Sequence, residues 1–322
     1  MIVQKNILPR FNNKLEEQIN KLFHSSNIPL YFNKTGNKEF TNYQRISIIV
    51  LFYKSKKSIR DFIEELYESK WVSWLGLKRI PGKSTLHDWL KIFSLKLIRD
   101  FVRLLFPKDV ELAAIDSTGL DAWQRSRHYE KRLEEFKKKK FEPMNYAKTT
   151  LFVDVKSKII LDWDLVMSRE HDVKIAERIF KRNKLKNLRG LGDKGYDSEN
   201  LHEIARENGI DFFAPVRKMD KRAFKDQRPS GFYRRKCKDN PPKDKGMRSI
   251  VENVNSVLKG KQITYLRSKK HFMRERELGW HIVLYNIGRT YRLNDSTEAQ
   301  TFLFLQIKIY VFWDNANIQL NI

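Results

Sequence analysis

Hydrophobic positions repeat every three to four residues along the first third of the chain. This spacing places apolar side chains on one face of an α-helix, as in the set Leu15, Ile19, Leu22, Phe23 and the set Ile46, Ile49, Val50, Tyr53. A hydroxyl residue followed three positions later by aspartate marks two further helix starts, at Ser58 and at Thr85. The pattern predicts an all-helical region over residues 1–109. The helix from Thr85 is either the DNA-reading helix of a helix-turn-helix or part of an ordinary helical bundle.

After Pro107 the pattern changes to short apolar runs. The run over residues 110–115 predicts a buried strand that a turn ends at Asp116, and residues 149–155 and 159–166 predict a β-hairpin. Further segments alternate in type: helices are predicted over residues 172–183, 198–208 and 247–260, and strands over 188–191 and 211–216. This order predicts an α/β domain over residues 110–293, with helices on the faces of a mixed sheet.

Residues 294–322 form an atypical C-terminal tail with strand-like alternation. Three interpretations stay open for this tail: an extra edge strand, a partner-binding segment, or sequence translated beyond a frameshift. An unpaired edge strand would be prone to aggregation.

The charge of the chain is strongly positive and unevenly distributed. The 322 residues contain 64 Lys and Arg against 39 Asp and Glu, a net charge of +25. Residues 217–276 hold 20 of the basic and 6 of the acidic side chains, whereas residues 149–216 hold 12 of each. The alternative is a generally lysine-rich surface that is only solvated, but such a composition would not leave residues 149–216 neutral. The clustering favours a polyanionic partner, and nucleic acid is the commonest one inside cells.

Several classes of protein are excluded by what the sequence lacks. No apolar run reaches the ~20 residues of a membrane span, and the first ten residues do not resemble a signal peptide. The single cysteine, Cys237, excludes an internal disulfide and a cysteine zinc site. No glycine-rich phosphate loop indicates ATP hydrolysis. We therefore expect a soluble cytoplasmic protein that associates with the nucleoid.

Three carboxylates carry the chemical hypothesis. Asp116 and Asp193 each follow a predicted strand, and the carboxyl ends of neighbouring strands meet at one edge of an α/β sheet. Glu252 lies on the helix predicted over residues 247–260, and spacings of four and seven place Arg248 and Lys259 on its face. Oxygen ligands without thiolates suit Mg²⁺ or Mn²⁺. Taken singly, an aspartate after a strand is more often a turn former or a helix cap.

The blocks Ile115-Asp-Ser-Thr118, Gly192-Asp-Lys-Gly-Tyr-Asp197 and Arg248-x3-Glu252-x6-Lys259 resemble those of insertion-sequence DDE transposases. The clade is the one marked by a Tyr-x2-Arg-x3-Glu-x6-Lys signature, and the resemblance covers about residues 40–292. One position departs from the signature, because Lys245 stands where the clade has tyrosine. Any base-stacking step assigned to that tyrosine is therefore not expected here.

The resemblance implies an RNase H-like five-stranded sheet with Asp116, Asp193 and Glu252 as catalytic residues that hold two Mg²⁺ or Mn²⁺ ions. It implies metal-dependent cleavage at the inverted-repeat ends of a DNA element and transfer of the freed 3′-hydroxyl into target DNA, by a homodimer. Double-stranded DNA is the expected partner. The basic side chains expected to contact it are Arg248, Lys259, Lys83, Arg60 and Arg125.

Two alternatives to an active transposase remain at the level of sequence. One is a domesticated or decayed DNA-binding protein that has lost catalysis, and the other is a simple nuclease of the same fold that cuts without joining. The three intact carboxylates favour the transposase over the decayed form, but cutting and joining use the same carboxylates.

Overall fold

The computed structural model describes residues 11–293 except 33–34, 36–37, 123–134, 136–145, 186, 218–228 and 264. The N-terminal part is helical, as predicted, with α1 (Phe11–Ser25), α2 (Asn42–Ser55), α3 (Ile59–Glu68), α4 (Trp71–Trp74), α5 (Lys83–Ile92) and α6 (Leu95–Leu104). Within this described part of the chain, no helix is both long enough and apolar enough to cross a membrane. The C-terminal tail and Arg125 lie outside the described residues.

A five-stranded mixed sheet follows the helices. Its strands are β1 (Leu112–Asp121), β2 (Tyr146–Asp154), β3 (Ile160–Val166), β4 (Leu188–Leu191) and β5 (Ile210–Phe213). They lie in the order β3-β2-β1-β4-β5. The first three strands pair antiparallel, and β4 joins both β1 and β5 in parallel. This is the arrangement of an RNase H-like sheet, so the predicted fold class is confirmed.

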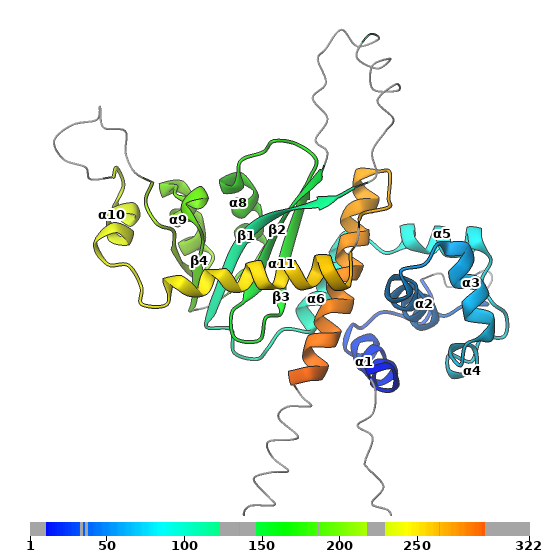
Figure 1. Cartoon of the computed structure of the whole chain (residues 1–322). Helices are drawn as coiled ribbons and strands as arrows, with labels where there is room; N and C mark the ends of the chain where they lie inside the picture. The colour runs from blue at the N-terminus through cyan, green and yellow to red at the C-terminus, as the bar shows by residue number, and fades with distance from the viewer. Residues whose placement is uncertain are drawn as a thin grey trace, which may run out of the picture.

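Helices cover both faces of the sheet (Figure 1). On one face, α8 (Asp172–Arg182) and α9 (Glu199–Glu207) form a core with alternate sheet residues such as Ile115. On the other face lie α11 (Ile250–Lys261) and a long helix over residues 271–293. The short helix α10 (Phe232–Asp239) stands at the β5 edge. The helices predicted over 172–183 and 198–208 are confirmed within one residue. The predicted hairpin is confirmed as well, but its first strand begins at Tyr146, three residues earlier than expected.

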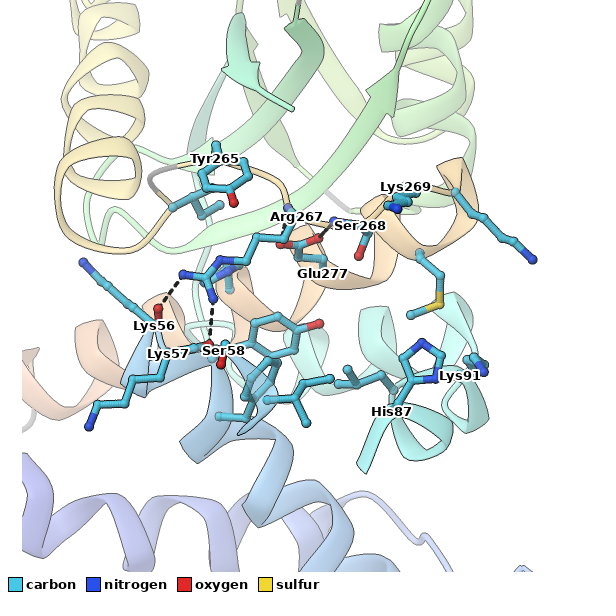
Figure 2. Close-up of a pocket in the computed structure, with 18 of the residues that line it drawn as sticks. Lys56, Lys57, Ser58, His87, Lys91, Tyr265, Arg267, Ser268, Lys269 and Glu277 are labelled. Carbon is cyan, nitrogen blue, oxygen red and sulfur yellow. Dashed lines mark hydrogen bonds between the residues drawn. The ribbon is translucent and has the colours of Figure 1, made fainter. Parts of the chain in front are cut away.

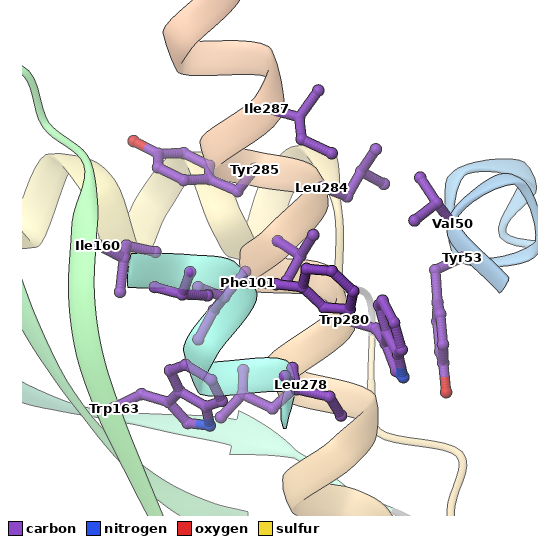
Figure 3. Close-up of a cluster of buried hydrophobic side chains, with 14 of the residues drawn as sticks. Val50, Tyr53, Phe101, Ile160, Trp163, Leu278, Trp280, Leu284, Tyr285 and Ile287 are labelled. Atoms are coloured by element: carbon purple, nitrogen blue, oxygen red, sulfur yellow. The ribbon is translucent and has the colours of Figure 1, made fainter. Parts of the chain in front are cut away.

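The helix over residues 271–293 joins the N-terminal helices to the sheet. Trp280 on this helix is fully buried, and its ring centroid lies 5.8 Å from that of Phe93 and 5.9 Å from that of Phe101. Figure 3 shows Trp280 between the α6 residue Phe101 and the α2 residue Tyr53, with the β3 residue Trp163 nearby. One continuous hydrophobic core therefore includes both the helical region and one face of the sheet.

The first strand is longer than predicted. The turn expected at Asp116 is absent from β1, which continues to Asp121 because β2 pairs with it from Ala113 to Asp121. The last β1 residue paired with β4 is Ala114. Asp116 therefore lies within a strand and not at its end, although it does lie beyond the part of β1 that has neighbours on both sides.

Three helix boundaries also differ from the prediction. The helix expected to begin at Thr85 begins at Lys83, with Gly82 as N-cap and no side-chain cap. Arg248 lies in a 3-10 turn, η2 (Lys245–Ser249), so it does not share an α-helical face with Glu252. Gly260 lies inside α11, which ends at Lys261. A single glycine costs an α-helix only about 1 kcal/mol, so packing of α11 on the sheet overrides it.

The helices that begin near the predicted starts at Ser58 and Thr85 are not joined by a tight turn. α3 ends at Glu68 and α5 begins at Lys83, with α4 between them. Ser58 caps α3 as predicted, since its side chain accepts a hydrogen bond from the Asp61 N–H. The role of α5 in DNA reading, and the division of the chain near residue 109, stay predictions.

Candidate active site

Asp116 points toward the α11 side of the sheet. Side chains alternate along a strand, and Ala114, two residues earlier, packs in the core that includes α11. Ile115 packs on the opposite face with α8 and α9. The alternation that places Asp116 beside α11 therefore places its neighbour Ser117 beside α8.

Asp193 reaches the same edge of the sheet from β4. The parallel pairing of β1 with β4 ends at Ala114 and Leu191, and each aspartate lies two residues beyond its paired residue. Asp193 caps the 3-10 turn η1 (Lys194–Tyr196), where its Oδ1 accepts a hydrogen bond of 2.6 Å from the Gly195 N–H. Neighbouring parallel strands thus place the two aspartates at the same edge of the sheet, and their shared catalytic role stays a prediction.

Gly195 leaves room for this carboxylate. A Cβ atom at position 195 would lie 2.8 Å from Asp193 Oδ1, a separation too short for a real contact. Any larger residue would displace the Asp193 side chain. The glycine of the Asp-Lys-Gly-Tyr segment is therefore explained by close approach to the carboxylate.

Glu252 completes the acidic group from the first turn of α11, and its side chain is exposed. The pKa of Asp116 is raised from its ordinary value of 3.8 to about 6, chiefly by burial. The negative charges of Asp193, Glu252 and Asp172 also raise the Asp116 pKa, whereas a hydrogen bond from the Ser117 backbone lowers it. The three predicted carboxylates therefore lie close enough to interact electrostatically, and a fourth lies beside them.

The donors fit a hard divalent cation by their chemistry. Carboxylate oxygens are what Mg²⁺ and Mn²⁺ prefer, and a cation would offset the like charges around Asp116. As they stand, however, no three His, Cys, Asp or Glu side chains among the described residues are gathered closely enough to hold a metal ion. The carboxylate side chains would have to converge around a bound ion, and exposed Glu252 has the freedom to do so.

A hydrogen-bonded cluster behind Asp116 was not predicted from the sequence. Ser117 Oγ donates to Asp172 Oδ1 at 2.6 Å and lies 2.7 Å from Thr150 Oγ1 and 3.0 Å from the Tyr196 hydroxyl. Lys148 Nζ lies 2.9 Å from Asp172 Oδ1. Asp172 was expected only to begin a helix. Strand alternation does predict that Ser117 and Asp116 point to opposite faces of the sheet. Nothing in the sequence, however, indicates which side chains contact Ser117.

The basic residues predicted to contact DNA fall into two groups. Arg248 and Lys259 flank Glu252 on η2 and α11, are exposed, and make no ion pair with any described residue. Arg60 and Lys83 are exposed on α3 and α5, away from the elements that carry the carboxylates. Tyr196 is 1% exposed and packs in the α8–α9 core, so its ring does not face solvent.

The strand order, with acidic side chains beyond the paired ends of two central parallel strands, defines an α/β protein of the RNase H-like class. Residues 108–287 match the family model described as Transposase DDE domain. The match spans more than half of the chain, so the chain belongs to this family of transposase domains.

Comparison with solved structures gives a further similarity. A piggyBac transposase chain, in a cryo-EM structure of its synaptic complex with hairpin DNA, superposes with a TM-score of 0.45 at 12% identity. The alignment covers 90% of this chain and 74% of that chain. At this identity, assignment to the family rests on the sequence match alone. No curated protein matches the chain in sequence.

Proposed function

We propose that this protein is an active transposase that cuts DNA at the ends of its own element and transfers the freed 3′-hydroxyl into target DNA. The observation that carries the proposal is the placement of Asp116 and Asp193 two residues beyond paired Ala114 and Leu191 on adjacent parallel strands. Glu252 adds a third carboxylate whose charge acts on Asp116. The match to the family of transposase DDE domains supports the same reaction.

In this proposal Asp116, Asp193 and Glu252 hold two Mg²⁺ or Mn²⁺ ions. When bound, such a pair supplies activation of the attacking oxygen and stabilisation of the leaving oxygen in an in-line displacement. The protein's part is to position the phosphodiester and to neutralise its charge. Arg248 and Lys259, exposed on either side of Glu252, bind phosphates next to the cut position.

The remaining contacts follow from the distribution of basic residues. Arg60 and Lys83 on the N-terminal helices bind double-stranded DNA away from the scissile bond. Arg125 is proposed as a further DNA contact. Two element ends must be held together for the reaction, so the protein acts on DNA as a homodimer.

The test uses a supercoiled plasmid carrying the gene with its native flanking DNA. Wild-type protein with Mg²⁺ should give new 3′ ends at matching inverted repeats. Asp116→Asn and Asp193→Asn should reduce cleavage by ~100-fold or more while retaining DNA binding. Asp109→Asn, which changes an exposed carboxylate before β1, is the matched control and should cut normally.

Other outcomes would replace the proposal. Cleavage without joined products would indicate a nuclease of the same fold. Tight DNA binding without metal-dependent cleavage by the wild type would indicate a decayed or domesticated protein. Cleavage retained in both aspartate variants would exclude the three-carboxylate site.

A further inference from the structure

A large cleft lies between the N-terminal helices and the segment that follows α11. One wall consists of residues 52–61, at the junction of α2 and α3, and of α5 residues His87, Leu90 and Lys91. The other wall is the segment over residues 262–273 together with the first turns of the helix over 271–293. The cleft has a volume of about 1130 Å³. Figure 2 shows its two walls facing each other.

The lining of this cleft is predominantly cationic. Six basic side chains contribute to it: Lys56, Lys57, Lys91, Arg267, Lys269 and Lys270. The acidic lining residues are Asp61 and Glu277. Both oxygens of Glu277 accept hydrogen bonds from backbone N–H groups, those of Arg267 and Ser268, each at 2.9 Å. The negative charge of Glu277 is therefore partly offset by these two N–H groups. Because basic side chains outnumber acidic ones in the lining, the cleft favours an anionic ligand.

Arg267 bridges the two walls. Its guanidinium donates a hydrogen bond of 2.6 Å to the Lys57 carbonyl and a second hydrogen bond to the Lys56 carbonyl (Figure 2). These carbonyls follow the end of α2, where a cation is favoured by the helix dipole. The width of the cleft is therefore set by a direct contact between residues 210 positions apart.

Aromatic rings are exposed in the same cleft. Tyr265 is 45% exposed and Phe272 is 44% exposed, so both rings are accessible to a ligand in the cleft. Cations accompany both rings, with Arg267 6.0 Å from the Tyr265 centroid and Lys270 6.0 Å from the Phe272 centroid. Basic side chains beside exposed aromatic rings are the combination that binds single-stranded nucleic acid, with phosphates at the cations and bases at the rings.

The wall of the cleft is attached to the two elements that carry Asp116 and Glu252. The Leu266 N–H donates a 2.7 Å hydrogen bond to the Asp121 carbonyl, which attaches the cleft wall to the end of β1. Along β1, Asp116 and Asp121 are about 17 Å apart at ~3.4 Å per residue. α11 ends at the same wall of the cleft. Along this helix, Glu252 and Lys261 are about 14 Å apart at ~1.5 Å per residue.

We propose that this cleft binds a few unpaired nucleotides of the DNA strand that passes over Asp116 and Glu252. The cleft is similar in volume to a large small-molecule pocket, so it has room for part of one strand and not for a double helix. This inference rests on the proposed function for the identity of the strand. The affinity of the cleft for single-stranded DNA does not depend on cleavage.

The test measures the fluorescence anisotropy of a labelled 12-nucleotide oligo-dT and of a labelled duplex, in EDTA and at fixed salt. Tyr265→Ala combined with Phe272→Ala leaves the net charge unchanged and should weaken oligo-dT binding by about ten-fold or more, with duplex binding changed less than two-fold. Lys270→Glu should also weaken oligo-dT binding. Lys156→Glu, in the exposed turn between β2 and β3, is the matched charge control and should bind oligo-dT as the wild type does.

A second measurement locates the contact without any variant. Photo-crosslinking of an oligonucleotide containing 5-iodo-deoxyuridine should label the peptide over residues 262–276. Crosslinks found only elsewhere, or equal losses of single-strand and duplex affinity in the aromatic variants, would overturn the cleft proposal. Oligo-dT binding in the cleft by a protein that fails to cut plasmid DNA would instead contradict the transposase proposal alone.

Discussion

Two neighbouring residues of β1 serve opposite faces of the sheet. Asp116 points to the α11 side, where Glu252 contributes to its raised pKa. Ser117 points to the α8 side, where it bonds Asp172 and the Tyr196 hydroxyl. The hydroxyl cluster holds the backbone directly behind Asp116. The carboxylate is thereby positioned from the far side of the sheet, by residues that need not contact DNA.

At the same scale, His281 is a buried base that cannot easily accept a proton. The pKa of His281 is lowered from 6.5 to about 3, chiefly by burial and in addition by the positive charges of Arg267 and Lys56. Its Nδ1 has no hydrogen-bond partner among the described residues, and its ring packs edge-on against Tyr53 with centroids 4.9 Å apart. The folded protein therefore keeps His281 neutral at pH values where the unfolded chain protonates it.

This difference predicts acid sensitivity. Between about pH 6.5 and pH 3 the unfolded state binds one more proton at position 281 than the folded state, so stability is lost as pH falls. His281→Phe keeps an aromatic ring beside Tyr53 and removes the titration. Urea unfolding from pH 7 to pH 4 should show a shallower decline for the variant, by up to ~1.4 kcal/mol per pH unit. Parallel declines would contradict the assignment.

At the scale of elements, the helix over residues 271–293 meets α6 and β3 through a glycine. A Cβ atom at Gly279 would lie 2.8 Å from both Ile98 Cγ2 and Trp163 Cζ2, closer than a real contact allows. The absence of a side chain lets this helix approach its two neighbours closely. A Cβ atom added at Gly260, inside α11, would have no neighbouring atom within 4 Å outside its own helix backbone.

The two glycines should therefore respond oppositely to the same substitution. Gly279→Ala forces Ile98 or Trp163 to move and should destabilise the protein by ~1–3 kcal/mol, despite the better helix propensity of alanine. Gly260→Ala adds propensity without a clash and should stabilise it by ~0.5–1 kcal/mol. Urea unfolding of both variants measures the difference. Stabilisation by Gly279→Ala would show that the contact is not tight.

At the scale of the whole molecule, the helical region and the sheet share one core. Trp280 contacts Phe93 and Phe101 in the helical region, and Trp163 of β3 belongs to the same buried cluster. The boundary predicted near residue 109 is thus crossed by extensive apolar packing. We expect the two parts to unfold together.

Trp280→Ala tests this cooperativity. Removal of a fully buried indole should cost ~3–5 kcal/mol and lower the melting temperature of the entire protein in a single calorimetric transition. Trp71→Ala, at a partly exposed position on α4, is the matched control and should cost less. Two separate transitions, with only one shifted by Trp280→Ala, would show that the two parts fold independently.

The sequence by itself determined the elements whose signals are local. The β-hairpin, the helix α8 and the four-residue strand β4 follow from alternation, helical spacing and turn residues within each segment. An apolar run that ends in an aspartate is also visible along the chain, so the sequence placed Asp116 and Asp193 at the same edge of the sheet, although Asp116 lies within β1 and not beyond it.

The tertiary structure alone decided the rest, because the interactions responsible join residues far apart in the chain. β1 continues through Asp116 since β2 supplies its hydrogen bonds, and no local pattern contains that pairing. Arg248 falls in the 3-10 turn η2, which contacts β1 and β4 before α11 begins, and no local pattern shows these contacts. The basic cleft exists only because Arg267 meets the end of α2, and the cluster behind Asp116 only because α8 folds onto Ser117.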